Sequence, residues 1–261
     1  MLGRHTRLFS GLETQWLNEI WHEDVAGSRR TWLQRMSIFF DTSLAELEAA
    51  CGDSGDVETT LDRMMSLLAS RAGKARWIEK TPGNAGAIPR ILLSWSQSRF
   101  LHVVRDPRDV YTSLLESGKW CEPASFADQW CATFGAARDW LLAAGGSHPA
   151  YYEIRYERLV LEPEQALQQV LDFLQEPWEP QLACFNGAPE DFERVLRATG
   201  KESRTLRRLA SPLTRSRVGV WRSVLEPERW DRVRAELERR GYGNVLDGVI
   251  SETESFVSSE G

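Results

Sequence analysis

The stretch 100–113 carries the residues best suited to bind an anion. An apolar run at 100–104 leads directly into Arg105, and Asp106 and Pro107 then open a helical pattern. A short, Val-rich apolar run is typical of a buried strand, whereas proline is favoured at the first position of a helix and aspartate as its N-cap. An arginine at the carboxyl end of a strand, beside a helix N-terminus, can bind a phosphate through its guanidinium fork.

Two further residues of this stretch have alternative roles. Asp109 can return a hydrogen bond in the manner of a capping box. Ser113 lies about two turns into the predicted helix, so its hydroxyl reaches the anion only if the helix packs beside it. The alternative is that Arg105 pairs with Asp106 or Asp109 and that Ser113 is only a small helix residue. Spacing alone leaves both interpretations open.

Two charged residues elsewhere could take part in group transfer. Lys80 follows a short strand predicted over 75–78 and could stabilise negative charge on a transferred group. Pairing with Glu79, or simple solvation, explains Lys80 equally well. Glu13 stands at the start of a predicted helix, where the helix dipole alone favours a carboxylate, and it could instead act as a general base.

A basic segment at 215–222 reads Arg-Ser-Arg-Val-Gly-Val-Trp-Arg. Guanidinium groups around a glycine can bind a phosphate, and an indole can stack on a base. The alternative is a solvated basic loop with Trp221 in the core.

The elements that must position these residues alternate along the chain. Predicted strands and helices therefore form βαβ units around a mostly parallel sheet. The apolar positions of the helices recur at helical spacing and are expected to face a core. The predicted strands are 75–78, 100–104 and 151–155, the predicted helices are 13–23, 29–51, 56–70, 85–96, 107–116, 125–144, 164–174 and 228–240, and an irregular region is expected at 176–217.

Length and composition set the class of protein. With 261 residues and 42% hydrophobic content, we expect one α/β domain over 1–245 and a polar, disordered tail over 246–261. No apolar run is long enough to span a membrane, and no secretory signal opens the chain. The four cysteines lack metal or disulfide spacing, and the net charge of −6 argues against a nucleic-acid surface. These features predict a cytoplasmic protein without a metal.

Taken in order, the motifs resemble those of the sulfotransferases that use 3′-phosphoadenosine 5′-phosphosulfate (PAPS), in particular the bacterial and tyrosylprotein-type branch. The resemblance covers about residues 8–243. It implies a P-loop NTPase-like parallel sheet flanked by helices. It also implies PAPS as the co-substrate, no metal, and a small-molecule or peptide acceptor with a hydroxyl or an amine. It does not indicate an oligomeric state.

The resemblance implies nucleotide contacts for several residues. The segment 105–110 with Ser113 is similar to the family's 3′-phosphate motif, so Arg105 and Ser113 would hold that phosphate. Tyr156 stands in a Tyr-Glu-Arg-Leu segment that resembles the family's Tyr-Glu-Asp-Leu, whose tyrosine approaches the adenine. Arg158 replaces the family's aspartate there.

The remaining motifs imply loop and catalytic roles. The basic segment near the C-terminus is similar to the family's Gly-x-Trp-Lys/Arg loop, so Gly219 and Trp221 would close over the nucleotide and Arg215 would contact a phosphate. Lys80 would lie near the transferred sulfuryl group. Glu13 stands in a Gly-x-Glu-Thr element and would serve as the base.

One family motif does not occur in the sequence. The family opens with a strand and a Pro-Arg/Lys-Ser-Gly-Thr-Thr loop that cradles the 5′-phosphosulfate, whereas residues 1–5 resemble the end of the helix that follows this loop. Either Met1 is an internal methionine of a longer protein, or the gene is truncated and its product is inactive. We therefore expect very low turnover and, because strand edges would lie open, poor solubility. The rival functions are a non-catalytic adenosine-bisphosphate-binding module and a helical interaction domain with a decayed site.

Overall fold

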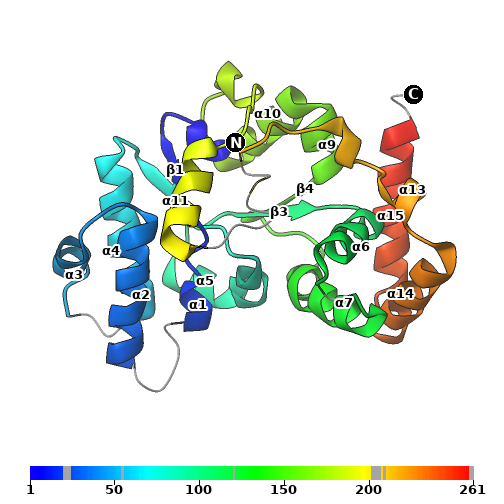
Figure 1. Cartoon of the computed structure of the whole chain (residues 1–261), viewed down its shortest axis with the longest axis horizontal. Coiled ribbons are helices and arrows are strands. Elements are labelled where there is room, and N and C mark those ends of the chain that lie inside the picture. Colours follow the sequence, from blue (N-terminus) through cyan, green and yellow to red (C-terminus); the bar gives the residue numbers. More distant parts are fainter. Residues whose placement is uncertain (20–24, 54–55, 120, 201–206, 208–209, 259–261) are drawn as a thin grey trace. The chain divides into compact units, whose positions relative to one another are not determined.

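The computed structural model has two compact units, each with its own sheet and core (Figure 1). The first unit contains Met1–Asn84 and Glu179–Leu213, and the second contains Ala85–Trp178 and Thr214–Gly261. A single functional domain over 1–245 stays a prediction. The structure describes residues 1–19, 25–53, 56–119, 121–200, 207 and 210–258.

The sheet of the first unit consists of two parallel strands. Strand β1 (Leu8–Ser10) pairs with β2 (Arg76–Ile78), Leu8 opposite Arg76 and Ser10 opposite Ile78. The strand at 75–78 was predicted, whereas β1 was not, because three residues are too few to show an alternating pattern. Parallel strands end at the same edge, so the segments that follow β1 and β2 begin side by side.

The helices of the first unit differ from the prediction in three places. The helix expected over 29–51 is interrupted: Asp41 takes a positive φ of 50°, and Ser43 caps a new helix by accepting a hydrogen bond from the Glu46 N–H. The region 176–217, expected to be irregular, contains helix α11. The helix predicted over 13–23 begins only at Trp16, because Gln15 takes a positive φ of 54°, and residues 20–23 lie outside the described ranges. The helices are α1 (Trp16–Glu19), α2 (Val25–Phe39), α3 (Leu44–Cys51), α4 (Val57–Arg71) and α11 (Pro189–Thr199).

The core of the first unit also fixes the turn after β1. Two side chains of α2 bind the carbonyl oxygen of Thr14: the Trp32 indole N–H at 2.8 Å and the Arg35 guanidinium at 2.9 Å. Burial of each large apolar side chain contributes roughly 1.5–3 kcal/mol. The apolar stripes predicted for the helices are confirmed, since the buried residues include Leu8, Trp16, Trp32, Leu33, Met36, Leu47, Leu61, Met64, Met65 and Leu68.

The second unit has a parallel pair of longer strands, both as predicted. Strand β3 (Phe100–Val104) pairs with β4 (Tyr151–Arg155), and Val104 lies opposite Arg155 at the carboxyl end. Arg105 and Tyr156 are the next residues of the two strands. The register therefore brings these two predicted site residues to one edge of the sheet.

Prolines begin several helices of this unit, as the sequence pattern predicts. A short π-helix, Cys131–Gly135, joins α7 to α8 in place of one uninterrupted helix over 125–144. The helices are α5 (Ile88–Ser94), α6 (Pro107–Ser117), α7 (Pro123–Trp130), α8 (Ala136–Ala143), α9 (Tyr156–Leu161), α10 (Pro163–Leu174), α13 (Trp221–Val224), α14 (Pro227–Arg239) and α15 (Gly243–Ser258).

The prediction of a disordered tail from residue 246 is wrong up to Ser258, because those residues belong to α15. Leu246 and Val249 are 0% and 2% exposed. Although α15 is rich in Ser and Glu, its apolar stripe is enough to pack the helix against the core. Its partners in the core include Val104, Tyr111, Phe126, Trp130, Val233 and Leu237.

Candidate functional site

The two residues predicted to be catalytic are in direct contact in the first unit. The Lys80 ammonium forms an ion pair with Oε1 of Glu13. The Gln15 amide donates to Oε2 of the same carboxylate at 2.9 Å. The side chains of Lys80 and Glu13 are 65% and 37% exposed, so both can reach a substrate from solvent. Lys80 thus pairs with Glu13, and its neighbour Glu79 has other partners.

Glu79 holds the turn that carries Glu13. Its Oε1 accepts hydrogen bonds from the Thr14 N–H at 3.1 Å, the Thr14 hydroxyl at 2.8 Å and the Thr81 hydroxyl at 2.7 Å. The Asn84 amide donates to its other oxygen. Sequence analysis did not assign Glu79 a role in the site. Its position beside Lys80, at the end of β2, was the available signal.

Arg105 joins three of the predicted nucleotide motifs in the second unit. Its Nη2 donates to the carbonyl oxygen of Arg217 at 2.5 Å and lies 3.6 Å from Oδ2 of Asp109. Its guanidinium carbon lies 4.7 Å from the centroid of the Tyr156 ring. Among the described residues, the buried Nε of Arg105 has no hydrogen-bond partner. The motifs around residues 105, 156 and 217 therefore converge.

The turn before α6 is capped differently from the prediction. Asp106 is the N-cap and accepts from the Arg108 N–H at 2.9 Å. The Asp106 N–H donates to Oε1 of Glu157 at 2.8 Å, so the predicted capping box with Asp109 is wrong. Burial raises the pKa of Glu157. Because α9 packs against this turn, Glu157 takes the role that the local sequence pattern assigned to Asp109.

The 215–222 loop is tied to α6 and α9 at separate points. Asp109 accepts from the Gly219 N–H at 2.8 Å and from the Trp221 N–H at 3.0 Å. The Arg215 guanidinium donates to the carbonyl oxygen of Leu161, the last residue of α9, at 3.0 Å. The loop is therefore held against this unit at Arg215, Gly219 and Trp221.

Trp221 lies against an arginine that is itself fixed. The Arg108 guanidinium carbon is 3.8 Å from the centroid of the Trp221 ring, and that of Arg222 is 5.0 Å away. Arg108 bonds to both oxygens of Asp106, at 3.0 and 2.7 Å, and to Glu254 at 2.8 Å. Cation–π contact stabilises such an arrangement. The Trp221 side chain is half-buried and packs against Arg108.

Ser113 lies on α6, beyond Arg105, and is half-buried. Its predicted contact with a 3′-phosphate stays a prediction.

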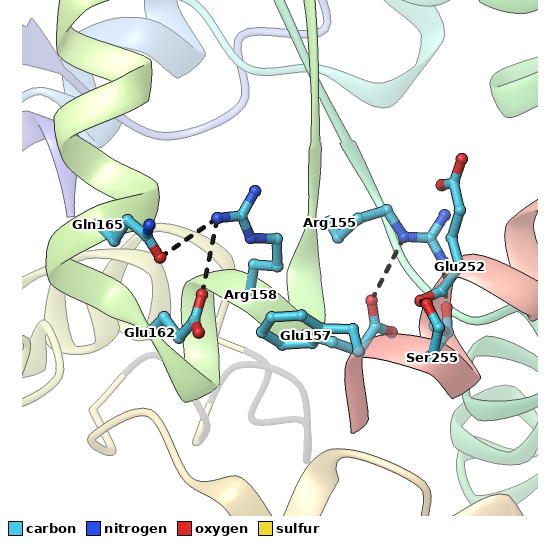
Figure 2. A pocket seen from close by; sticks show the side chains of 9 residues that line it. Arg155, Glu157, Arg158, Glu162, Gln165, Glu252 and Ser255 are labelled. Atoms are coloured by element: carbon cyan, nitrogen blue, oxygen red, sulfur yellow. Dashed lines mark hydrogen bonds and ion pairs between the residues drawn. The ribbon is translucent and has the colours of Figure 1, made fainter. Parts of the chain in front are cut away.

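A cavity of about 540 Å³ lies between α9, α10 and α15 (Figure 2). Arg158, which stands where the sequence motif has aspartate in the family, lies 3.6 Å from Glu162 and 3.4 Å from Gln165. Across the cavity, Arg155 lies 3.8 Å from Glu157. The predicted site residues do not line this cavity. Its two arginines, Arg155 and Arg158, pair with carboxylates that also line it.

In the part of the chain that the structure describes, no three His, Cys, Asp or Glu side chains gather into a group that could hold a metal ion. Over the same residues, every helix is too short or too polar to cross a membrane.

The chain belongs to the sulfotransferase family, because the family profile matches residues 1–180. The resemblance noted in the sequence motifs is thus confirmed at the level of the family. The match ends before the 215–222 loop, so the roles of that loop depend on its motif and its contacts.

Two solved structures share the fold. The sulfotransferase domain from the curacin biosynthetic pathway aligns with a TM-score of 0.57 and 19% identity, over 91% of this chain and 90% of that one. The sulfotransferase domain from the Synechococcus PCC 7002 olefin synthase aligns with a TM-score of 0.54 and 18% identity, over 91% and 86%. The expected fold class, an α/β protein of the P-loop NTPase-like type with parallel strands, is confirmed.

An uncharacterised protein of Aquifex aeolicus (strain VF5) is 24% identical over 215 residues. The match covers 77% of this chain and 25% of that protein, so the chain corresponds to about a quarter of its relative's length.

Proposed function

We propose that the protein transfers a sulfuryl group from PAPS to a hydroxyl or amine of a small-molecule or peptide acceptor. Membership of the sulfotransferase family supports sulfuryl transfer in general. The choice of donor depends on one observation: Arg105 lies over the Tyr156 ring and binds the 215–222 loop at Arg217. Three motifs that the family uses for one nucleotide thus meet at one arginine. The proposal includes a cytoplasmic setting and a reaction without a metal.

Residues of the second unit would hold the nucleotide. Among the described residues, the buried Nε of Arg105 has no hydrogen-bond partner. This N–H suits an anionic ligand, because a guanidinium binds phosphate through paired N–H groups. Ser113 and Arg215 would add contacts to the 3′-phosphate. Tyr156 and the loop residues Gly219 and Trp221 would contact the adenosine.

Glu13 and Lys80 would carry the chemistry. When bound, PAPS supplies the activated sulfuryl group. Glu13 would take the proton from the acceptor hydroxyl or amine, as a general base must. Lys80 would stabilise the negative charge that develops on the transferred group. To do so, its ammonium leaves the ion pair with Glu13, which frees the carboxylate to accept the proton. In such transfers, positioning and charge stabilisation dominate the rate enhancement.

Transfer from ³⁵S-labelled PAPS to a panel of phenols, alcohols, amines and tyrosine peptides tests the reaction. The chain as given and a version extended upstream in frame are assayed side by side. Glu13→Gln should lower transfer by roughly 100-fold or more, whereas Glu48→Gln, which alters an exposed ion pair with Arg30, should not. Transfer that survives Glu13→Gln would contradict the assignment of the base. Nucleotide binding without transfer in either version would support the non-catalytic module instead.

A further inference from the structure

The Asp109 carboxylate has an unusual pair of partners. Its side chain is 1% exposed, and each of its oxygens accepts one backbone N–H of the 215–222 loop, from Gly219 at 2.8 Å and Trp221 at 3.0 Å. A buried carboxylate is costly unless its oxygens are hydrogen-bonded, and bonds from backbone N–H groups to an ionised acceptor are among the stronger ones. The pairing therefore joins α6 to a loop about a hundred residues away in sequence.

The loop backbone is shaped to present these two N–H groups. Gly219 has a φ of 73°, in the left-handed region that glycine adopts without strain. A Cβ at this position would meet only the end of the Arg222 side chain. The backbone conformation, more than the space, therefore favours glycine here.

Arg105 is not the main partner of Asp109. Their closest atoms are 3.6 Å apart, beyond hydrogen-bond range, and the same Nη2 of Arg105 donates to the Arg217 carbonyl at 2.5 Å. The two side chains therefore hold different parts of one loop: Arg105 holds it at Arg217, and Asp109 holds it at Gly219 and Trp221.

We propose that Asp109 is the positioning residue of the 215–222 loop, which it orders for contact with the 3′-phosphorylated end of the nucleotide. The effect of Asp109 on nucleotide binding rests on the proposed function. The effect of Asp109 on the order of the loop does not rest on it, and this order can be measured without any ligand.

Amide hydrogen exchange tests the ordering directly. In the wild-type protein, the Gly219 and Trp221 amides should exchange at least about tenfold more slowly than their unstructured rates. In Asp109→Asn they should exchange at least about tenfold faster than in the wild type, the loss expected for one charge-assisted hydrogen bond. The Val233 and Leu237 amides of α14 should change by less than about twofold. Asp128→Asn, which removes an exposed carboxylate of the same unit, is the control and should leave all four amides unchanged.

Two results would overturn the proposal. One is a wild-type protein in which the loop amides are unprotected, and this measurement stands even if Asp109→Asn does not fold. The other is an equal acceleration of loop and core amides in Asp109→Asn, which would indicate general destabilisation.

The affinity for adenosine 3′,5′-bisphosphate separates positioning from charge. Removing a carboxylate beside Arg105 should by itself strengthen phosphate binding, whereas losing the order of the loop should weaken it. We expect Asp109→Asn to bind the bisphosphate about tenfold more weakly, with Asp109→Glu restoring part of the loss. Adenosine 5′-monophosphate should also bind more weakly, because Gly219 and Trp221 of the loop would contact the adenosine. Tighter bisphosphate binding would overturn the positioning role. If the wild type binds neither nucleotide, the proposed function fails, while the exchange experiment still decides the role of Asp109 in the loop.

Discussion

The Lys80 ammonium lies against the Glu13 carboxylate, so the residues after two neighbouring parallel strands form one ion pair. Both side chains remain open to solvent, the lysine more than the glutamate. An exposed pair of this kind stabilises a fold by only about 0–1 kcal/mol. The ion pair therefore contributes little to stability, and it holds the proposed base next to the proposed catalytic cation.

Replacing the lysine should separate chemistry from binding. Lys80→Met should lower sulfuryl transfer by roughly 100-fold or more, because the developing charge loses its stabilising cation. Affinity for adenosine 3′,5′-bisphosphate should stay the same, since the predicted nucleotide contacts are other residues. Transfer rates and calorimetric titration of the same preparation measure both. Lys119→Met, at an exposed position, is the matched control, and equal transfer by the two variants would exclude Lys80 from the reaction.

Glu79 should matter through the turn it holds. Glu79→Gln replaces a carboxylate oxygen that accepts from Thr14 and Thr81, and loss of such partly buried bonds costs about 1–3 kcal/mol. Urea unfolding should show this loss. Transfer should fall as well, because Glu13 precedes Thr14 directly and would no longer be held in place. Unchanged stability together with unchanged transfer would contradict a positioning role for Glu79.

His102 should make stability depend on pH. It lies on β3, with its Nδ1 2.5 Å from the Tyr151 hydroxyl and near Glu153 on β4. Burial, and then the positive charge of Arg138, lowers the pKa of His102 from 6.5 to about 4. The unfolded chain therefore binds a proton more readily between these values, so the stabilising contribution is complete above pH 6.5 and is lost as the pH falls towards 4.

Urea unfolding at pH 7 and pH 4.5 measures this contribution. The wild type should lose up to about 3 kcal/mol more than His102→Gln over this interval. Burial raises the pKa of Glu153, which acts in the opposite direction. Equal losses in the two proteins would show that His102 does not titrate as described.

Sequence pattern predicted the second sheet and its helix starts more closely than the rest of the fold. Strands 100–104 and 151–155 agree with the structure to the residue, because each is an uninterrupted run bounded by clear turn or helix signals. The prolines that begin α6 and α10 fixed those starts in the same way. Strand β1 and helix α11 were missed because their short or polar sequences depend on tertiary partners for their stability.

The candidate site, like the fold, was predicted only in part from the sequence. The predicted residues were identified by motif, but their partners could not be read from spacing. Asp109 looked like a local capping residue, and only the structure shows that it binds the backbone at Gly219 and Trp221. The Asp106 N–H donates to Glu157, which lies on a separate helix, and not to Asp109 as expected. Long-range pairings of this kind depend on packing and have no local periodicity.

Calorimetric titration with adenosine 3′,5′-bisphosphate and adenosine 5′-monophosphate tests the central claim most directly. The wild type should bind the bisphosphate at least about tenfold more tightly, as charge-assisted hydrogen bonds to the 3′-phosphate require. Arg105→Ala should remove this difference, and Arg234→Ala, which removes a surface ion pair between α14 and α15, should keep it. A wild type that binds both nucleotides equally, or an Arg105→Ala variant that keeps the preference, would contradict the assignment of a 3′-phosphate site at Arg105.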